Sequence, residues 1–91
     1  MNKNNNHPIC RTNKYGTKRR YLNSLFHRED GPAIEYADGS KFWFNHGYLH
    51  RLDGSAIEAF NGDKYWYYHG KHIDCTSQEE FEKLINLKCL W

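Results

Sequence analysis

The sequence predicts a mainly β fold: an antiparallel β-meander of about two and a half 23-residue hairpin repeats with one short C-terminal α-helix. Three features of the sequence predict it: an internal repeat, turn-forming residue pairs at regular intervals, and a helix-capping pattern near the C-terminus. A short repeat unit cannot bury its hydrophobic face alone and is stable only when it packs against its neighbours. We therefore expect residues 1–91 to form a single domain.

The internal repeat has a period of 23 residues. When residues 27–49 are aligned with residues 50–72, 12 of the 23 positions are identical, including the run His-Arg-x-Asp-Gly. A further shift by the same period aligns a weaker unit that begins near Pro8. The chain thus divides into a polar tail (1–7), a degenerate repeat (8–26), two full repeats (27–49 and 50–72) and a C-terminal helical cap (73–91).

Each full repeat contains the pattern of a β-hairpin. Predicted strands flank Asp38-Gly39 in the first full repeat and Asn61-Gly62 in the second. Both pairs favour type I′ turns, in which the two central residues have a positive φ. The Asp-Gly pairs at 30–31 and 53–54 predict one more turn per repeat, in which the carboxylate accepts backbone N–H groups. The predicted structural turn anchors are Asp30, Gly31, Gly39, Asp53, Gly54 and Gly62.

The C-terminal segment has the pattern of one amphipathic helix over residues 77–88. Ser77 and Glu80 match a capping box, and Phe81, Leu84 and Ile85 follow at helical spacing. We expect this helix to cover an end or a face of the sheet, because an exposed sheet edge invites aggregation.

Composition excludes several classes of protein. The mean hydropathy is −0.99, and no apolar segment approaches the length of about 18 residues that a membrane helix needs. The polar N-terminus lacks the apolar segment of a secretory signal. Cys10, Cys75 and Cys89 are too widely spaced for a disulfide framework or a zinc ribbon, so reduced thiols are favoured and a single disulfide stays open. We expect a cytoplasmic protein with no membrane partner.

Charge is distributed unevenly along the chain. Residues 1–28 carry seven Lys or Arg and no acid, for a net charge of +7, whereas six basic and eleven acidic residues give residues 29–91 a charge of −5. Such asymmetry can mark a basic arm for nucleic acid or for an acidic protein. The alternative is a solvated basic strand that the acidic remainder balances, and this alternative is favoured.

The run His27-Arg28-Glu29-Asp30-Gly31-Pro32-Ala33-Ile34-Glu35, followed by a Gly turn and an aromatic strand with Trp, resembles the MORN-like repeat variant of phage and bacterial small proteins. The resemblance covers residues 27–72 strongly and 8–26 weakly. It implies a small β-meander with an interaction role, no reaction and no particular partner. The first unit departs from the pattern, because Arg19-Arg20 replaces its aromatic pair, and Ser55 stands where Pro is usual.

The His-Arg-x-Asp sets invite a metal or catalytic interpretation, because His27 with Asp30 and His50 with Asp53 could supply ligands. Residues that recur with every repeat are more simply explained as part of the repeat, whereas a catalytic site assembles unlike groups once. We therefore predict no catalytic residue, no cofactor and no metal, and keep a metal-dependent enzyme as a second alternative.

Aromatic residues supply 16% of the chain, and neighbouring strand residues point to opposite faces, so rings occur on both faces of the predicted sheet. One ring-bearing face is expected to be exposed, or else to be covered by the helix, the N-terminal arm or a second subunit. We predict a non-enzymatic protein-binding module, a phage-type inhibitor that blocks a host protein in an anti-defence role such as anti-CRISPR, in the host cytoplasm. Alternatives are a nucleic-acid or anionic-surface binder that uses the basic unit, and a homodimer. The predicted partner-binding residues are Lys18, Arg19, Arg20, Trp43, Tyr48, Trp66 and Tyr68.

Overall fold

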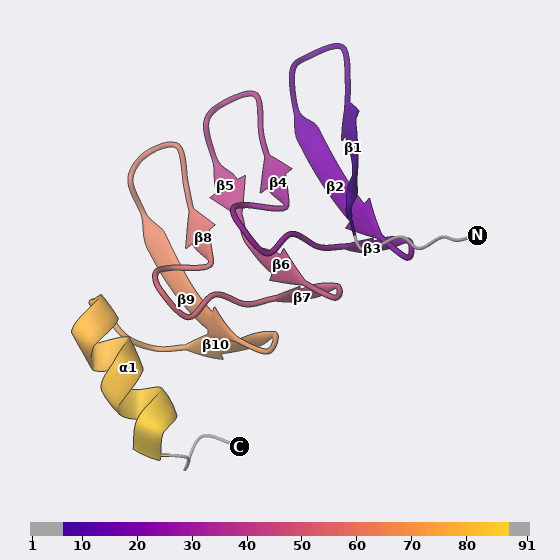
Figure 1. The fold of residues 1–91 in the computed structure, drawn as a ribbon. Helices are drawn as coiled ribbons and strands as arrows, with labels where there is room; N and C mark the ends of the chain where they lie inside the picture. Colours follow the sequence, from indigo (N-terminus) through magenta and orange to yellow (C-terminus); the bar gives the residue numbers. More distant parts are fainter. Residues whose placement is uncertain (1–6, 88–91) are drawn as a thin grey trace.

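The computed structural model describes residues 7–87, which form antiparallel strands followed by one C-terminal helix (Figure 1). This confirms the predicted mainly β, antiparallel fold with one C-terminal helix. The elements are β1 (Ile9–Thr12), β2 (Lys18–Leu22), β3 (Leu25–Phe26), β4 (Ile34–Glu35), β5 (Lys41–Phe42), β6 (Phe44–Asn45), β7 (Tyr48–Leu49), β8 (Ile57–Glu58), β9 (Lys64–Tyr68), β10 (Lys71–Ile73) and α1 (Gln78–Leu87).

One sheet runs through the molecule in the order β1-β2-β4-β5-β8-β9-β10, with β3 paired to β2, while β6 and β7 pair with each other. Figure 1 shows three tall hairpins side by side, β1–β2, β4–β5 and β8–β9, each followed by a short hairpin at its base. The molecule is thin, with principal extents of 42 × 34 × 16 Å. A sheet this thin presents two faces, and their coverage decides what the protein offers to other molecules.

The turns at the tips of the tall hairpins differ from the prediction. In the second hairpin, Gly39 N donates to Tyr36 O, Tyr36 N donates to Ser40 O, and Gly39 has a φ of 97°. Asp38 is not among the positive-φ residues, and its Oδ1 accepts from Ser40 N at 2.9 Å. The type I′ prediction for Asp38-Gly39 is therefore wrong, because a three-residue loop puts only its glycine in the left-handed region. The same backbone bonds recur at the tip around Gly62.

The type I′ geometry occurs instead at the short hairpins. His46 and Gly47 have φ values of 49° and 88°, and His69 and Gly70 have 49° and 82°. The first unit uses Asn23 and Ser24 at the equivalent place, both with positive φ. Two consecutive left-handed residues match the twist of the strands that they join.

Strand pairing assigns each side chain to a face, because directly paired residues share one. One row across the sheet is Lys18, Glu35, Lys41, Glu58 and Lys64, and the row on the opposite face is Arg19, Ile34, Phe42, Ile57 and Tyr65. We call the first the loop-covered face and the second the aromatic face.

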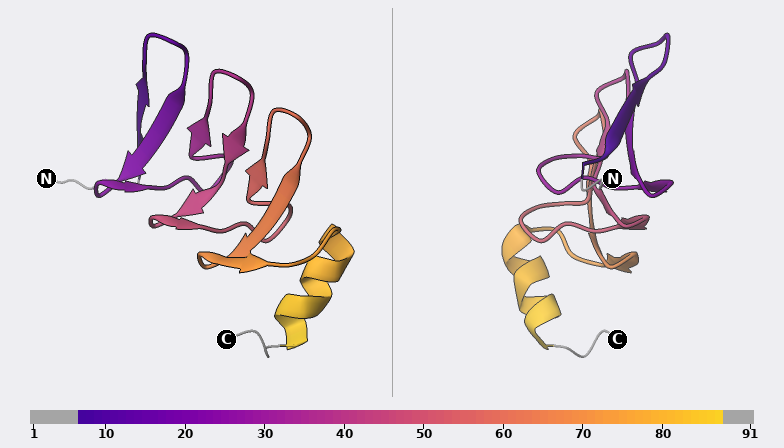
Figure 2. Two further views of the ribbon diagram at one scale, coloured as in Figure 1. Left: turned by 180° about the vertical axis from the view of Figure 1, so that it is seen from behind. Right: turned by 45° about the vertical axis from the view of Figure 1, so that its right-hand side comes forward.

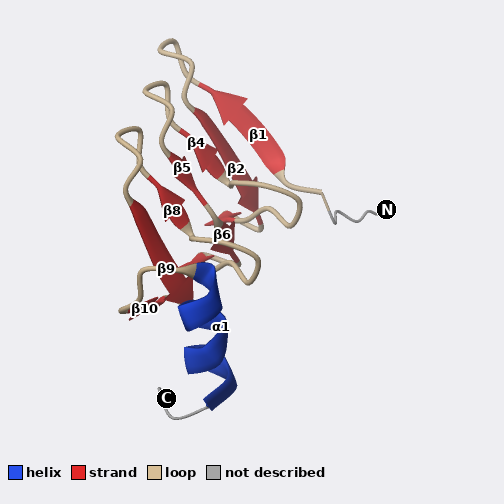
Figure 3. Ribbon diagram, turned by 90° about the vertical axis from the view of Figure 1, so that its left-hand side faces the viewer, coloured by secondary structure: helices blue, strands red, loops and turns tan. Residues whose placement is uncertain are grey.

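The helix packs on the loop-covered face at the β9–β10 end of the sheet (Figure 3). Trp66 is 7% exposed, and its Nε1 donates to Gln78 Oε1 at 2.9 Å. Phe81 and Ile73 complete this core cluster. Ser77 caps α1, since its Oγ accepts from Glu80 N at 3.1 Å. The helix prediction is confirmed through Leu87, and residue 88 lies outside the described residues.

The connecting loops at 28–32 and 51–55 lie on the same side as the helix, whereas the short hairpins project to the other side (Figure 2). The loop-covered face is thus filled unit by unit: one loop reaches Arg20, the next reaches Trp43, and α1 reaches Trp66. The aromatic face lies opposite these covering segments.

Candidate functional site

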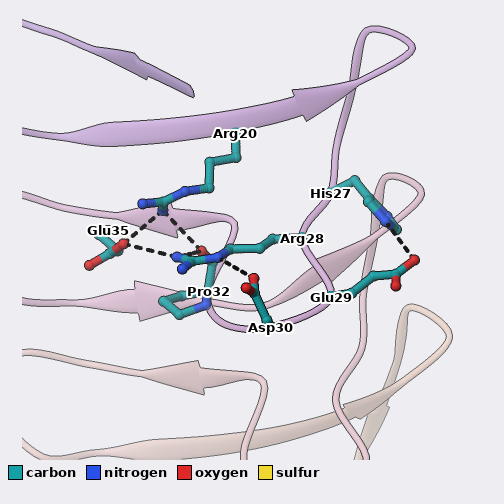
Figure 4. A network of polar contacts seen from close by, with 7 residues as sticks. All are labelled: Arg20, His27, Arg28, Glu29, Asp30, Pro32 and Glu35. Atoms are coloured by element: carbon teal, nitrogen blue, oxygen red, sulfur yellow. Dashed lines mark hydrogen bonds and ion pairs between the residues drawn. The ribbon is translucent and has the colours of Figure 1, made fainter. Parts of the chain in front are cut away.

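Each full repeat contains an arginine that binds its own loop. Arg28 donates from Nε to Asp30 Oδ1 at 2.8 Å, and from Nη1 to Pro32 O and Glu35 Oε2, both at 3.2 Å (Figure 4). In the next repeat Arg51 makes the same three bonds at 3.0–3.1 Å, to Asp53, Ser55 O and Glu58. The His-Arg-x-Asp-Gly run therefore encodes an arginine bridge that closes the loop onto the sheet.

The glycine of this run is needed for the approach of the arginine. A Cβ on Gly31 would lie 2.9 Å from Arg28 Cζ, and one on Gly54 would lie 2.7 Å from Arg51 Cζ. Neither glycine has a positive φ. Asp30 and Asp53 anchor their loops through the guanidinium. The partner of each aspartate is thus the arginine two residues before it, which the spacing alone did not identify.

The guanidinium groups also lower the pKa values of two carboxylates that they contact. The hydrogen bond from Arg28 lowers the pKa of Asp30. Arg20 donates from Nη1 to Glu35 Oε2 at 2.7 Å, and this bond lowers the pKa of Glu35 against the opposing effect of burial. Figure 4 shows Arg20 and Arg28 converging on Glu35 and on the carbonyl of Pro32.

The histidines of the full repeats hold the turn of the following short hairpin. His27 is 1% exposed, and its Nδ1 accepts from His46 N at 2.9 Å. His50 Nδ1 accepts from His69 N at the same distance, and burial lowers the pKa of His50. Because Nδ1 accepts a backbone N–H, the proton of each neutral ring lies on Nε2, so neither nitrogen offers a free lone pair to a metal. Within residues 7–87, no three His, Cys, Asp or Glu side chains are grouped as a metal site requires.

The predicted partner-binding aromatics lie mainly on the loop-covered face. The prediction that Trp66 is exposed is wrong, because α1 buries it. Tyr68 packs against the same cluster. Trp43 is half-buried beneath Arg51, whose Cζ is 3.8 Å from the centroid of the indole ring. Sequence alternation identified two faces but could not say which one the loops and the helix would cover.

Tyr48 is 62% exposed and lies at the base of the sheet. Its ring rests on the next turn, where a Cβ on Gly70 would approach Tyr48 Cδ1 to 2.9 Å. Leu25 contacts Gly47 in the same manner one unit earlier. Tyr48 therefore combines a contact between units with a large accessible surface.

The aromatic face holds a continuous series of ring contacts. Tyr21 contacts Phe26 at a centroid distance of 5.0 Å, and Phe26 contacts Phe44 at 5.2 Å. Phe42 continues the series to Phe44 at 6.5 Å and to Tyr36 at 5.2 Å. Nearer to the C-terminus, β9 adds Tyr65, which is 42% exposed, and Tyr67. These rings are half-buried or exposed, and they were not singled out from the sequence, although their alternation with Trp43 and Trp66 was the available signal.

The structure divides the predicted basic residues between the faces. Lys18 and Arg20 lie on the loop-covered face beside Glu35. Arg19 lies on the aromatic face, directly opposite Arg11 and with its Cζ 5.9 Å from the centroid of the Tyr36 ring. The basic charge available beside the aromatic rings thus comes from Arg11 and Arg19.

A groove of about 720 Å³ lies between the connecting loops at 28–32 and 51–55. It is lined by Arg28, Asp30, Trp43, His50 and Arg51, among others. Its arginines and aspartates are bonded to one another.

Cys10 and Cys75 are free thiols, and Cys89 lies outside the described residues. Burial raises the pKa of Cys75, so its thiol stays protonated at neutral pH.

Comparisons with protein-family models, with curated proteins and with solved structures gave no match. The resemblance to the MORN-like repeat variant therefore stays a prediction. In the described part of the chain, no helix is long and apolar enough to cross a membrane.

Proposed function

We propose that this chain is a non-enzymatic protein-binding module, which acts by occupying the surface of another protein with its aromatic face. The observation that carries the proposal is the series of half-buried rings on the face opposite the loops and α1, together with the exposed ring of Tyr65 on the same face. Large accessible aromatic patches on proteins commonly mark contacts, and Tyr and Trp are enriched among residues that dominate binding energy.

The scaffold supports this proposal because it presents the rings on a fixed surface. The strands that carry them are held by backbone pairing and by the arginine bridges on the other face. A preorganised surface loses little conformational freedom on binding, which favours affinity. The chemistry that the two repeats share, His with Arg and Asp, is used to hold the turns and to close the loops.

The narrower proposal is a phage-type inhibitor that blocks a host protein, and its support is the resemblance of residues 27–72 to the MORN-like repeat variant. A stoichiometric inhibitor of this kind would need only a binding surface. The nucleic-acid alternative is favoured by one observation, the Arg11–Arg19 pair beside Tyr36, because such proteins combine cations with stacking rings.

The test compares the wild-type chain with a variant of the aromatic face and a matched variant of the other face. Tyr65→Arg places on β9 the residue type that Arg19 already provides at the equivalent position, so folding is expected to be retained. Lys64→Gln changes the adjacent residue of β9, on the loop-covered face. Partners captured from bacterial lysate are identified by mass spectrometry and then purified for a binary binding measurement.

We expect a stoichiometric complex that Lys64→Gln leaves intact and Tyr65→Arg weakens by about tenfold or more. Light scattering at several concentrations provides the control for self-association. A stable homodimer that Tyr65→Arg disrupts would assign the aromatic face to assembly and would overturn the proposal.

A further inference from the structure

Strand β1 lies at an open edge of the sheet, and all four of its residues are exposed. Its partner β2 determines which backbone groups of β1 point outward. Arg20 N donates to Ala33 O, on the β4 side of β2, and so points away from β1. Cys10 and Arg20, which are paired across β1 and β2, therefore form no backbone hydrogen bond with each other. The N–H and C=O groups of Cys10, and of Thr12 two residues later, therefore point away from the sheet. Such an edge is a template for a strand from another chain.

Two arginines of like charge face each other beside this edge. Arg11 pairs directly with Arg19 across β1 and β2, on the aromatic face. Like charges directly opposite in a sheet destabilise it. Across residues 7–87 neither guanidinium forms an ion pair with a carboxylate, whereas Arg20, Arg28 and Arg51 all do. A carboxylate supplied from outside would relieve this repulsion.

We propose that the partner of this module presents an extended acidic segment, which adds to the sheet as a strand beside β1 and sets a carboxylate against Arg11 and Arg19. This inference rests on the proposed function and names the chemical class of the partner. A residue paired with Arg11 in the added strand would share the aromatic face with both arginines, because paired residues point to the same side. Backbone bonds to Cys10 and Thr12 would provide affinity, and the carboxylate would provide selectivity.

Charge argues against a second copy of this chain as the occupant of the edge. Pairing β1 with the β1 of another copy would bring two Arg11–Arg19 pairs together and multiply the repulsion. An acidic strand has the complementary charge, which also raises the association rate.

The test is an NMR titration of the full ¹⁵N-labelled chain with three synthetic peptides. The first alternates glutamate with valine, the second replaces each glutamate by lysine, and the third is the glutamate peptide N-methylated on the residues whose N–H groups would face β1. We expect the amides of Cys10 and Thr12 to shift with the glutamate peptide and to be unaffected by the other two. Arg11→Gln with Arg19→Gln should weaken that binding by about tenfold or more. This double variant should melt no lower than the wild type, because it removes a repulsion.

Equal binding of the lysine or N-methylated peptide, or no shift with the glutamate peptide, would overturn the inference. Stronger binding of a single-stranded oligothymidylate to Arg11 and Arg19 would replace it with the nucleic-acid alternative. Concentration-dependent shifts at β1 without any peptide would replace it with self-association. A partner complex that is lost in Tyr65→Arg but intact in the double arginine variant would retain the proposed function and refute this inference alone.

Discussion

The guanidinium of Arg51 lies over the indole of Trp43, with its Cζ 3.8 Å from the ring centroid. The contact joins two successive repeats, since Trp43 ends the tall hairpin of one and Arg51 opens the next. A cation over a partly desolvated indole is stabilising, and the same guanidinium is fixed by Asp53 and Glu58. One side chain thus closes its own loop and covers its neighbour.

The first prediction concerns Arg51. Arg51→Ala should lower the free energy of unfolding by about 2–4 kcal/mol, because it removes the bonds to Asp53, Ser55 O and Glu58 and uncovers Trp43. Arg51→Lys should rescue little of this loss, since an ammonium cannot reproduce the planar fork of donors. Urea denaturation measures the change, and Arg11→Gln, on the exposed edge strand, is the control expected to be neutral or slightly stabilising. A fully stable Arg51→Lys variant would contradict the bridging role.

The second prediction separates two requirements for glycine. Gly54→Ala should cost about 1–3 kcal/mol, because the new Cβ would meet the guanidinium of Arg51. In an Arg51→Ala background this cost should largely disappear. Gly39→Val should destabilise the chain in either background, because it forces a β-branched residue to a φ of 97°. A double-mutant cycle with no coupling between Arg51 and Gly54 would contradict the steric explanation.

The third prediction concerns pH. Burial and the nearby His69 lower the pKa of His50 below its ordinary value of 6.5, and its Nδ1 must stay unprotonated to accept from His69 N. The unfolded chain therefore binds the proton more readily than the folded chain. His50 stabilises fully above about pH 6.5, and this contribution falls as the pH drops from that value toward the lowered pKa.

His50→Asn should flatten the pH dependence of the melting temperature in that window, because an amide oxygen can accept the same bond without titrating. His7→Asn, at an exposed position, is the matched control. The pKa values of Asp30 and Glu35 are lowered by their arginine partners, so their contributions to stability are lost only at a more acidic pH, below the ordinary values of 3.8 and 4.5. An unchanged profile in His50→Asn would show that His50 does not govern this window.

The fourth prediction is a stabilising substitution. Ser55 is 3% exposed, and within the described residues its Oγ has no hydrogen-bond partner. The equivalent position in the preceding repeat is Pro32, whose carbonyl accepts from Arg28 as that of Ser55 accepts from Arg51. Ser55→Pro should therefore raise the stability by about 1 kcal/mol. Ser40 is the contrasting buried serine, and Ser40→Ala should destabilise, because its Oγ accepts from Phe60 N at 2.9 Å. Destabilisation by Ser55→Pro would show that the two loops differ in backbone conformation.

Much of the fold followed from local patterns in the sequence. The hairpin tips at Gly39 and Gly62 and the helix after Ser77 depend on short-range turn and capping chemistry, which neighbouring residues specify. The predicted turn type was wrong. The Asp38 carboxylate accepts from Ser40 N and Asp38 keeps a negative φ, whereas the preference of Asp-Gly pairs for type I′ turns assumes a positive φ at both residues.

The candidate site was less predictable because it depends on long-range packing. Phe42 and Trp43 are adjacent and equally aromatic, so alternation alone places them on opposite faces without ranking the faces. The loop that covers Trp43 and the helix that covers Trp66 belong to later segments of the chain. The close approach of the Arg51 guanidinium to Gly54 could not be predicted either, since a glycine in an Asp-Gly pair first suggests a turn.

The amide of Gln78 reaches Trp66 from the segment after its repeat, as Arg51 reaches Trp43: its Oε1 accepts from the edge of the indole at Nε1, and its Nε2 donates to Leu52 O at 2.8 Å. The helix thus covers the last repeat where the connecting loop of a further unit would lie. The number of repeats is therefore set by the point in the sequence at which the helical segment follows them. A chain with an additional copy of residues 50–72 inserted before Ile73 should gain one more hairpin and keep the same ending.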